Sequence, residues 1–158
     1  MIAIRPAEPA DAAELVRLRR LMFQAMNGAD RPGPWEEEAQ RLLELQLAAR
    51  PRTLGAFVVD GDGPYLAACA VGTVEQRLPA PGHPTGRFGF VFNVCTDLRH
   101  RGQGYARQTT AALLDWFAGQ GVTRVDLHAT DEAERLYRSM GFAEHSLALS
   151  RDLSKPLG

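Results

Sequence analysis

The chain has 158 residues, of which 45% are hydrophobic and 23% are charged. This balance is typical of a globular protein of one domain, so we expect a single domain over residues 1–158. The formal net charge of −1 provides no global attraction to nucleic acid or to a membrane surface, and we expect neither as a partner. The N-terminus carries no long apolar run of the kind found in signal peptides, which favours a cytoplasmic location.

The first third of the chain predicts one short strand and two helices. Residues 2–5 predict the strand. The acids Asp11 and Glu14 have the spacing of a capping box and precede apolar residues at helical intervals, which predicts a helix over 10–26. A leucine-rich segment with acids in its first turn predicts the second helix over 35–49.

The middle of the chain is predicted to form strands. Residues 54–59 and 65–75 flank the turn Asp60-Gly-Asp-Gly63, which is typical of a β-hairpin. A loop rich in proline and glycine, over 77–87, precedes a third strand over 88–96. That third strand is almost entirely apolar, as expected for a strand covered on both faces of its sheet.

The last third of the chain alternates helices and strands. It predicts a helix over 104–119, a strand over 122–129, a helix from a capping box at Asp131 to about Met140, and a final strand over 146–151. No internal repeat or long linker divides the chain. We therefore predict an α/β fold of the α+β type, in which helices pack on one mixed sheet.

Cysteines and histidines show no metal-binding pattern. Cys69 and Cys95 lie in separate apolar segments and are expected to be buried, reduced thiols. The four histidines form no close pair, so we expect no metal site. With a net charge near zero, any bound anion must be held by a local arrangement of groups.

The segment from Val94 to Arg107 joins a buried strand to a helix through a basic turn. Backbone N–H groups at a helix N-terminus have no partner and carry partial positive charge, and a phosphate satisfies both conditions. Gly102 and Gly104 have no Cβ, so the backbone can approach a ligand closely. Arg101 and the arginine at 107 can add charge-assisted hydrogen bonds. The pattern predicts a phosphate site.

Two other interpretations of this turn are open. A Gly-x-Gly segment also occurs in flexible turns with solvated arginines, but here a strand precedes the turn, a helix follows it and three arginines lie close by. A dinucleotide-binding turn requires Gly-x-Gly-x-x-Gly/Ala directly after the first strand of a βαβ unit. The spacing from Gly102 to Ala106 is shorter, and the preceding strand is not the first of such a unit.

Two motifs resemble those of the GNAT N-acetyltransferases. Arg101-Gly-Gln-Gly-Tyr-Ala106 matches the family signature (Gln/Arg)-x-x-Gly-x-(Gly/Ala), and Leu136-Tyr137-Arg-Ser-Met-Gly-Phe142 is similar to the family's Leu-Tyr-x-x-x-Gly-Phe. The resemblance covers nearly the whole chain. It implies a GNAT-type acyl-CoA N-acyltransferase fold, with a central, mostly antiparallel, twisted sheet flanked by helices. It also implies acetyl-CoA as the cosubstrate, with no metal.

The same resemblance implies where acetyl-CoA binds. A strand that splays from its neighbour offers free backbone groups to the pantetheine arm, and the turn holds the pyrophosphate. Many members carry Asn seven residues before the motif tyrosine, where this chain has Thr130, a residue suited to a helix N-cap. The implied cofactor-binding residues are Val94, Cys95, Thr96, Arg101, Gly102, Gln103, Gly104, Tyr105, Ala106 and Arg107.

Acetyl transfer to an amine requires that the amine lose a proton, that an oxyanion be stabilised and that the thiolate leave. The resemblance places Tyr137 near the cofactor sulfur, where it could act as the general acid, with core packing as the alternative role. A backbone N–H within residues 94–96 could stabilise the oxyanion. Glu75 is the candidate base, with a water relay as the alternative. Asn93 interrupts an apolar strand, must find hydrogen bonds if buried, and is a third candidate catalytic residue.

We therefore expect an acetyl-CoA-dependent N-acetyltransferase that acts on an amine of a small molecule, peptide or protein. A non-catalytic module of the same fold that binds or senses acyl-CoA is the alternative, and a nucleotide-binding α/β domain is a third interpretation. The loop over 77–87 carries Arg77, His83 and Arg87, which favours an acidic or polar acceptor. A homodimer is also compatible with the sequence.

Overall fold

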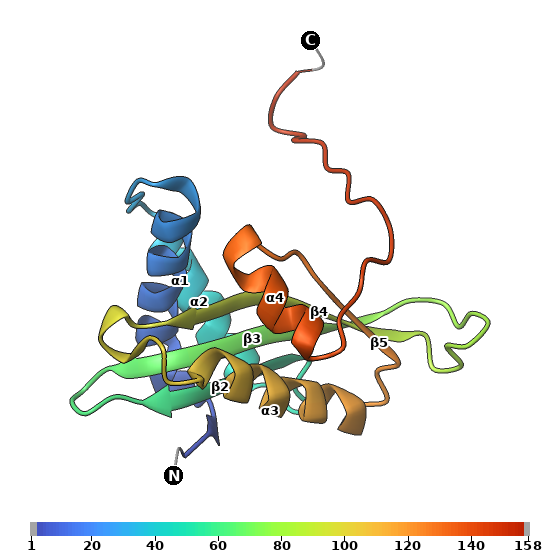
Figure 1. Ribbon diagram of the computed structural model, residues 1–158, viewed down its shortest axis with the longest axis horizontal. Helices are drawn as coiled ribbons and strands as arrows, with labels where there is room; N and C mark the ends of the chain where they lie inside the picture. Colours follow the sequence, from blue (N-terminus) through green and yellow to red (C-terminus); the bar gives the residue numbers. More distant parts are fainter. Residues whose placement is uncertain (1–2, 157–158) are drawn as a thin grey trace.

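The structure is a computed structural model that describes residues 3–156. Its centre is a five-stranded sheet in the order β1-β2-β3-β4-β5, with helices packed on it (Figure 1). Neighbouring strands are antiparallel except for β4 and β5, which are parallel, so the predicted mixed and mostly antiparallel sheet is confirmed. The strands are β1 (Arg5–Pro6), β2 (Leu54–Asp60), β3 (Leu66–Gln76), β4 (Arg87–Thr96) and β5 (Arg124–Leu127).

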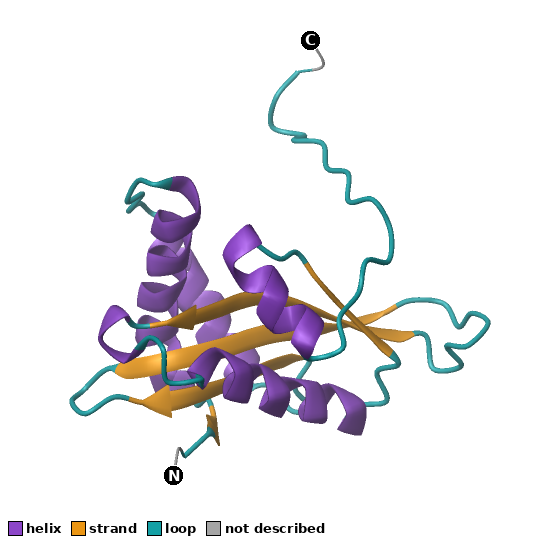
Figure 2. Cartoon of the chain, viewed as in Figure 1, coloured by secondary structure: helices purple, strands orange, loops and turns teal. Residues whose placement is uncertain are grey.

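Within the described residues, four α-helices form where the helical spacing of apolar residues predicts them (Figure 2). Short 3-10 turns at Pro9–Asp11 and Leu98–His100 precede α1 and α3. The strand predicted over 2–5 is found only at its last residue, and residue 2 lies outside the described range. The helices are α1 (Ala12–Asn27), α2 (Trp35–Ala48), α3 (Tyr105–Gly119) and α4 (Asp131–Ser139).

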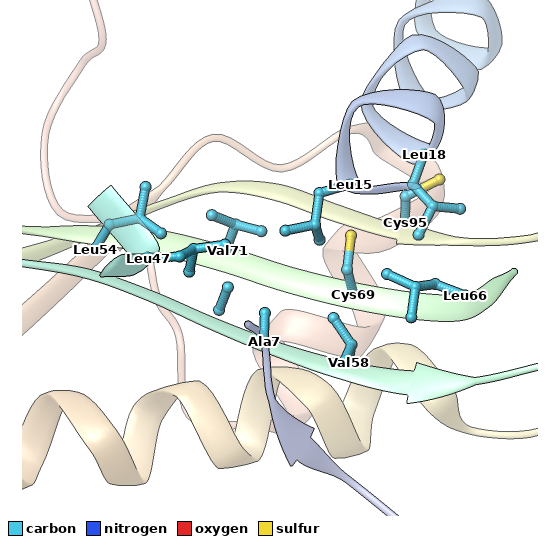
Figure 3. Packing of buried hydrophobic residues seen from close by; sticks show 11 residues of the cluster. Ala7, Leu15, Leu18, Leu47, Leu54, Val58, Leu66, Cys69, Val71 and Cys95 are labelled. Carbon is cyan, nitrogen blue, oxygen red and sulfur yellow. The ribbon is translucent and has the colours of Figure 1, made fainter. Parts of the chain in front are cut away.

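The larger hydrophobic core lies between the sheet and the helices α1 and α2 (Figure 3). Leu15 and Leu18 of α1 and Leu47 of α2 are at most 1% exposed and pack in one cluster with residues of β2, β3 and β4. Cys69 and Cys95 stand opposite each other in this core as free thiols, which confirms that expectation. Burial raises the pKa of Cys69 to about 12 and that of Cys95 to about 11, so both remain protonated.

A second core lies between the opposite face of the sheet and α3. Leu113 and Phe117 of α3 are fully buried there. Glycines in the strands make this close packing possible, because a Cβ at Gly55 would lie 2.5 Å from Trp116 and a Cβ at Gly72 would lie 2.8 Å from Phe117. The sheet thus holds α3, and with it the predicted phosphate turn that precedes α3, in a fixed position.

The prediction of a final strand over 146–151 is wrong. Within residues 3–156 no strand follows β5, and the chain leaves the sheet as an extended segment (Figure 2). Leu147 and Leu149 are 83% and 86% exposed, so the alternating pattern buries nothing. Alternation marks a segment that can form a strand, but a strand also needs the hydrogen bonds of a neighbouring strand and a surface to cover.

Neither predicted capping box forms between the residues that the sequence indicated. The carboxylate of Asp11 accepts a hydrogen bond from the backbone N–H of Glu8, 2.7 Å away, so it stabilises the 3-10 turn before α1 and forms no box with Glu14. Helix α4 begins at Asp131, so its N-cap lies one residue before the predicted cap. The hydroxyl of Thr130 accepts a hydrogen bond from the first turn of α4, which confirms Thr130 as the N-cap.

Candidate active site

The predicted phosphate turn has the geometry of an anion cradle. Gly102 and Gly104 have φ of 79° and 80°, in the left-handed region that side chains disfavour. Gly104 is the N-cap of α3 and provides no side-chain cap, so the N–H groups of the first helical turn stay available. A Cβ at Gly102 would meet nothing within 4 Å, and one at Gly104 would meet only Gln108 Nε2 at 3.9 Å. The space in front of the glycines is open.

A buried carboxylate, that of Asp97, fixes the chain directly before this turn. Asp97 is 4% exposed and accepts hydrogen bonds from the backbone N–H and the Nε of Arg99, both at 2.9 Å. It also accepts one from Nη1 of Arg17 in α1 at 2.8 Å. The hydrogen bonds from Arg99 and Arg17 hold the pKa of Asp97 well below its ordinary value. The ionised Asp97 therefore ties the turn to α1.

The end of β4 separates from β5. The parallel pairing of the two strands runs only from Phe88 to Val91 of β4, whereas β4 stays paired with β3 as far as Thr96. A bulge at Phe92 interrupts the register with β3. Because alternate backbone groups of a strand point to opposite sides, several N–H and C=O groups of residues 92–96 face the side that β5 has left. Among these residues, Val94, Cys95 and Thr96 are the ones expected to bind the pantetheine arm.

One cavity of about 750 Å³ runs past the turn and the open end of β4. Every predicted cofactor-binding residue lines this cavity except Gln103, which is exposed beside it. Thr130 lines it as well, although its hydroxyl is used by the helix cap. Residues of β4, α4 and α1 form much of the remaining wall, among them Asn93, Tyr137, Arg19, Met22, Phe23 and Met26.

Tyr137 lies at the cavity and is also packed against its neighbours. Its side chain reaches the cavity wall from α4, yet the residue is only 8% exposed and its ring packs edge-to-face against Phe142 at 5.8 Å. Burial raises the pKa of Tyr137 above its ordinary value. The hydroxyl is therefore protonated at neutral pH, as a general acid must be.

The other two predicted catalytic residues are placed differently. Asn93 is 2% exposed and lines the cavity, where its Oδ1 accepts a hydrogen bond from Arg19 at 3.2 Å and its Nδ2 donates to Cys69 Sγ at 3.4 Å. Glu75 is exposed, forms an ion pair with Arg77 at 3.0 Å and is not among the cavity residues. The hydrogen bond from Arg77 lowers the pKa of Glu75. The structure does not bring Glu75 to the other site residues.

Arg19 is a site residue that the sequence reasoning missed. Its guanidinium carbon lies 4.6 Å from the centre of the Phe23 ring and 5.6 Å from that of Phe92, on the cavity wall. The available signal was its position in the helix, four residues after Leu15 and three before Met22. These intervals place an arginine on the apolar face of α1.

Neither a metal cluster nor a membrane-spanning helix is found in the part of the chain that the structure describes. Within residues 3–156 no three histidines, cysteines or acids lie close enough together to hold a metal ion. None of the described helices has both the length and the apolar composition needed to cross a bilayer.

Comparison with known families assigns the chain to a family. A model of the Acetyltransferase (GNAT) family matches residues 17–142. The chain belongs to the GNAT acetyltransferase family. The matched region contains most of α1, the strands β2 to β5, the phosphate turn and the motif around Tyr137, so the resemblance seen in the sequence is confirmed.

Individual GNAT relatives agree with this assignment. The mouse protein N-acetyltransferase 8 is 33% identical over 116 residues, which make up 69% of this chain and 50% of that protein. The chain thus spans about half the length of this curated relative.

Solved structures share the fold at lower identity. A predicted acetyltransferase from Clostridium acetobutylicum, solved with acetyl-CoA, has a TM-score of 0.83 and 22% identity, and covers 98% of this chain and 97% of that chain. Glucosamine-6-phosphate N-acetyltransferase from Arabidopsis thaliana has a TM-score of 0.76 and 20% identity, with 97% and 99% covered.

Proposed function

We propose that this chain transfers an acetyl group from acetyl-CoA to the nitrogen of an amine carried by a small molecule, peptide or protein. The observation that carries the proposal is that the glycine turn, the open end of β4 and Tyr137 line one cavity. The Clostridium relative was solved with acetyl-CoA, which supports this choice of cosubstrate.

The residues present fit acetyl-CoA along its length. The open, left-handed turn at Gly102 and Gly104 suits the pyrophosphate, and the first-turn N–H groups of α3 would donate hydrogen bonds to it. Arg101 and Arg107 line the same part of the cavity and would add charge-assisted hydrogen bonds. The unpaired backbone groups within residues 92–96 would bind the amides of the pantetheine arm.

Acetyl-CoA, when bound, supplies a thioester carbon that a neutral amine can attack. A backbone N–H at the open end of β4 would donate a hydrogen bond to the carbonyl oxygen as negative charge develops there. Tyr137 would hold a proton at Oη and donate it to the departing sulfur. Glu75 lies outside the cavity, so we assign the removal of the amine proton to water in the cavity.

Release of free thiol from acetyl-CoA tests this function. With a mixed panel of primary amines the protein should release thiol at a rate that depends on the amine, and Tyr137→Phe should lower that rate by about 10²–10⁴-fold. Thermal stabilisation by acetyl-CoA, measured in parallel, reports binding separately from turnover. Stabilisation without thiol release for any amine would favour a module that only binds or senses acyl-CoA.

A further inference from the structure

Arg19 is a cation in the cavity wall that is not neutralised by its neighbours. The flanking Arg17 and Arg20 of α1 pair with carboxylates at 2.8 and 2.6 Å. In the part of the chain that the structure describes, no carboxylate lies within ion-pair distance of Arg19, and its one hydrogen bond goes to the neutral amide of Asn93. A guanidinium has five N–H donors, so most of the donors of Arg19 remain available.

The surroundings make this free charge costly. Arg19 is half-buried, with its guanidinium over the rings of Phe23 and Phe92, and burial lowers its pKa. A charge that has lost part of its hydration is unfavourable until an opposite charge compensates it. The low dielectric that creates this cost also strengthens the attraction for an anion that enters the cavity.

The anion that Arg19 would meet is distinct from the cofactor's phosphates. The glycine turn, with Arg101 and Arg107, already provides for the pyrophosphate on the α3 side of the sheet. The bulge at Phe92 turns both Phe92 and Asn93 toward the α1 side, where they meet Arg19, whereas Val94 packs in the core under α3. Arg19 therefore faces the half of the cavity that is left for the acceptor.

The wall around Arg19 is apolar. Met22, Phe23 and Met26 of α1 and Phe92 of β4 line this part of the cavity. Two acids, Asp131 and Glu132, also line the cavity, but they stand in the first turn of α4 and neither pairs with Arg19. A ligand complementary to this part of the cavity would carry an apolar group beside an anionic one.

We propose that Arg19 binds an anionic oxygen group of the acceptor, a carboxylate or a phosphate, and that the acceptor is an amine whose apolar body contacts the methionines and phenylalanines beside it. This inference rests on the proposed function, because it names the chemistry of the acceptor in the same cavity. It makes Arg19 a residue that determines specificity, and it makes Asn93 the residue that positions Arg19.

Matched pairs of amines test this assignment. Phenylalanine and phenethylamine differ only by a carboxylate, and tyramine phosphate and tyramine differ only by a phosphate. We expect kcat/KM for the anionic member of at least one pair to be about 10- to 100-fold higher, as for a charged hydrogen bond. The pair that shows the preference distinguishes a carboxylate from a phosphate.

Variants of adjacent residues assign the preference to Arg19. Arg19→Gln should raise KM for the anionic amine far more than for the neutral amine, which removes the preference, and Arg19→Lys should retain most of it. Arg20→Gln is the matched control, because Arg20 pairs with Asp30 and does not line the cavity. No preference in either pair, or a preference that Arg19→Gln does not change, would overturn the assignment.

A binding measurement separates this assignment from the proposed function. Calorimetry in the presence of CoA can compare N-acetylphenylalanine with N-acetylphenethylamine, and the matching phosphorylated and neutral N-acetyltyramines, without any turnover. If no amine is acetylated, the proposed function fails. Tighter binding of an anionic product that Arg19→Gln abolishes would still support the role of Arg19, and equal binding would reject it.

Discussion

Replacing Gly104 with valine should abolish acetyl-CoA binding and leave the fold in place. Gly104 has a φ of 80°, which costs a β-branched residue about 1–3 kcal/mol. The new Cβ adds no steric clash, because it would meet only Gln108 Nε2 at 3.9 Å. A domain with about 5–15 kcal/mol of stability tolerates such a loss.

The effect on binding should be larger. Valine would occupy the open space before the first turn of α3 and remove at least two charge-assisted hydrogen bonds of about 1.5–3 kcal/mol each, which raises Kd by about 100-fold or more. Acetyl-CoA at 100 times the parent Kd stabilises the parent by about 2.7 kcal/mol, or about 5–10 °C in Tm. The same concentration should stabilise Gly104→Val by no more than about 0.4 kcal/mol.

Thermal unfolding with and without acetyl-CoA measures both effects. Gly82→Val is the matched control, because Gly82 has a φ of 79°, a Cβ there would meet nothing within 4 Å, and the residue lies in a loop outside the cavity. It should lose similar stability and keep the full acetyl-CoA shift. If Gly104→Val keeps the parental shift, the pyrophosphate binds elsewhere and the assignment of the turn is wrong.

Four further substitutions test other parts of the structure. Tyr137→Phe should lower kcat by about 10²–10⁴-fold with acetyl-CoA binding unchanged, and normal turnover would leave Tyr137 with a packing role only. Asp97→Asn should destabilise the protein at pH 7, because two arginines lose their shared carboxylate, although the partial exposure of both arginines limits the loss. Arg99 holds the pKa of Asp97 below its ordinary 3.8, so this stabilisation is complete above that value and is lost as the pH falls below it. The urea midpoints of parent and variant should therefore converge in acid, and a constant difference would refute the ionic role. Leu18→Ala should cost about 2–5 kcal/mol in urea unfolding, and a negligible loss would contradict its complete burial. Glu75→Gln should leave kcat/KM unchanged, whereas a loss above about tenfold would restore Glu75 as the base.

Elements whose packing follows from the local spacing of apolar residues could be predicted from the sequence. The apolar run over 88–96 became β4, and the helical spacing of Leu15, Leu18 and Met22 became the buried face of α1. The final strand over 146–151 could not be judged in this way, because its formation depends on a neighbouring strand elsewhere in the chain. The prediction of a capping box at Asp11 was wrong because its carboxylate had two possible partners in the sequence and accepts a hydrogen bond from Glu8 in the structure.

The candidate site likewise has a part that could be predicted from the sequence and a part that could not. The phosphate turn could be predicted because its residues, from Arg101 to Arg107, are contiguous and their order defines the geometry. The contact between Arg19 and Asn93 could not, because 74 positions separate the two residues and only the tertiary fold joins them. Glu75 was chosen for lying at a strand end, but that position does not say whether the end reaches the cavity.

Tracing a labelled acetyl group tests the central claim most directly. The protein is incubated with acetyl-CoA that carries carbon-13 in its acetyl group and with a panel of primary amines, and mass spectrometry follows the label. We predict that the label appears on the nitrogen of at least one amine, with one free CoA thiol released for each acetylated product. If acetyl-CoA binds and the label remains on CoA for every amine, the chain is not an N-acetyltransferase for such amines, and a binding module is the better account.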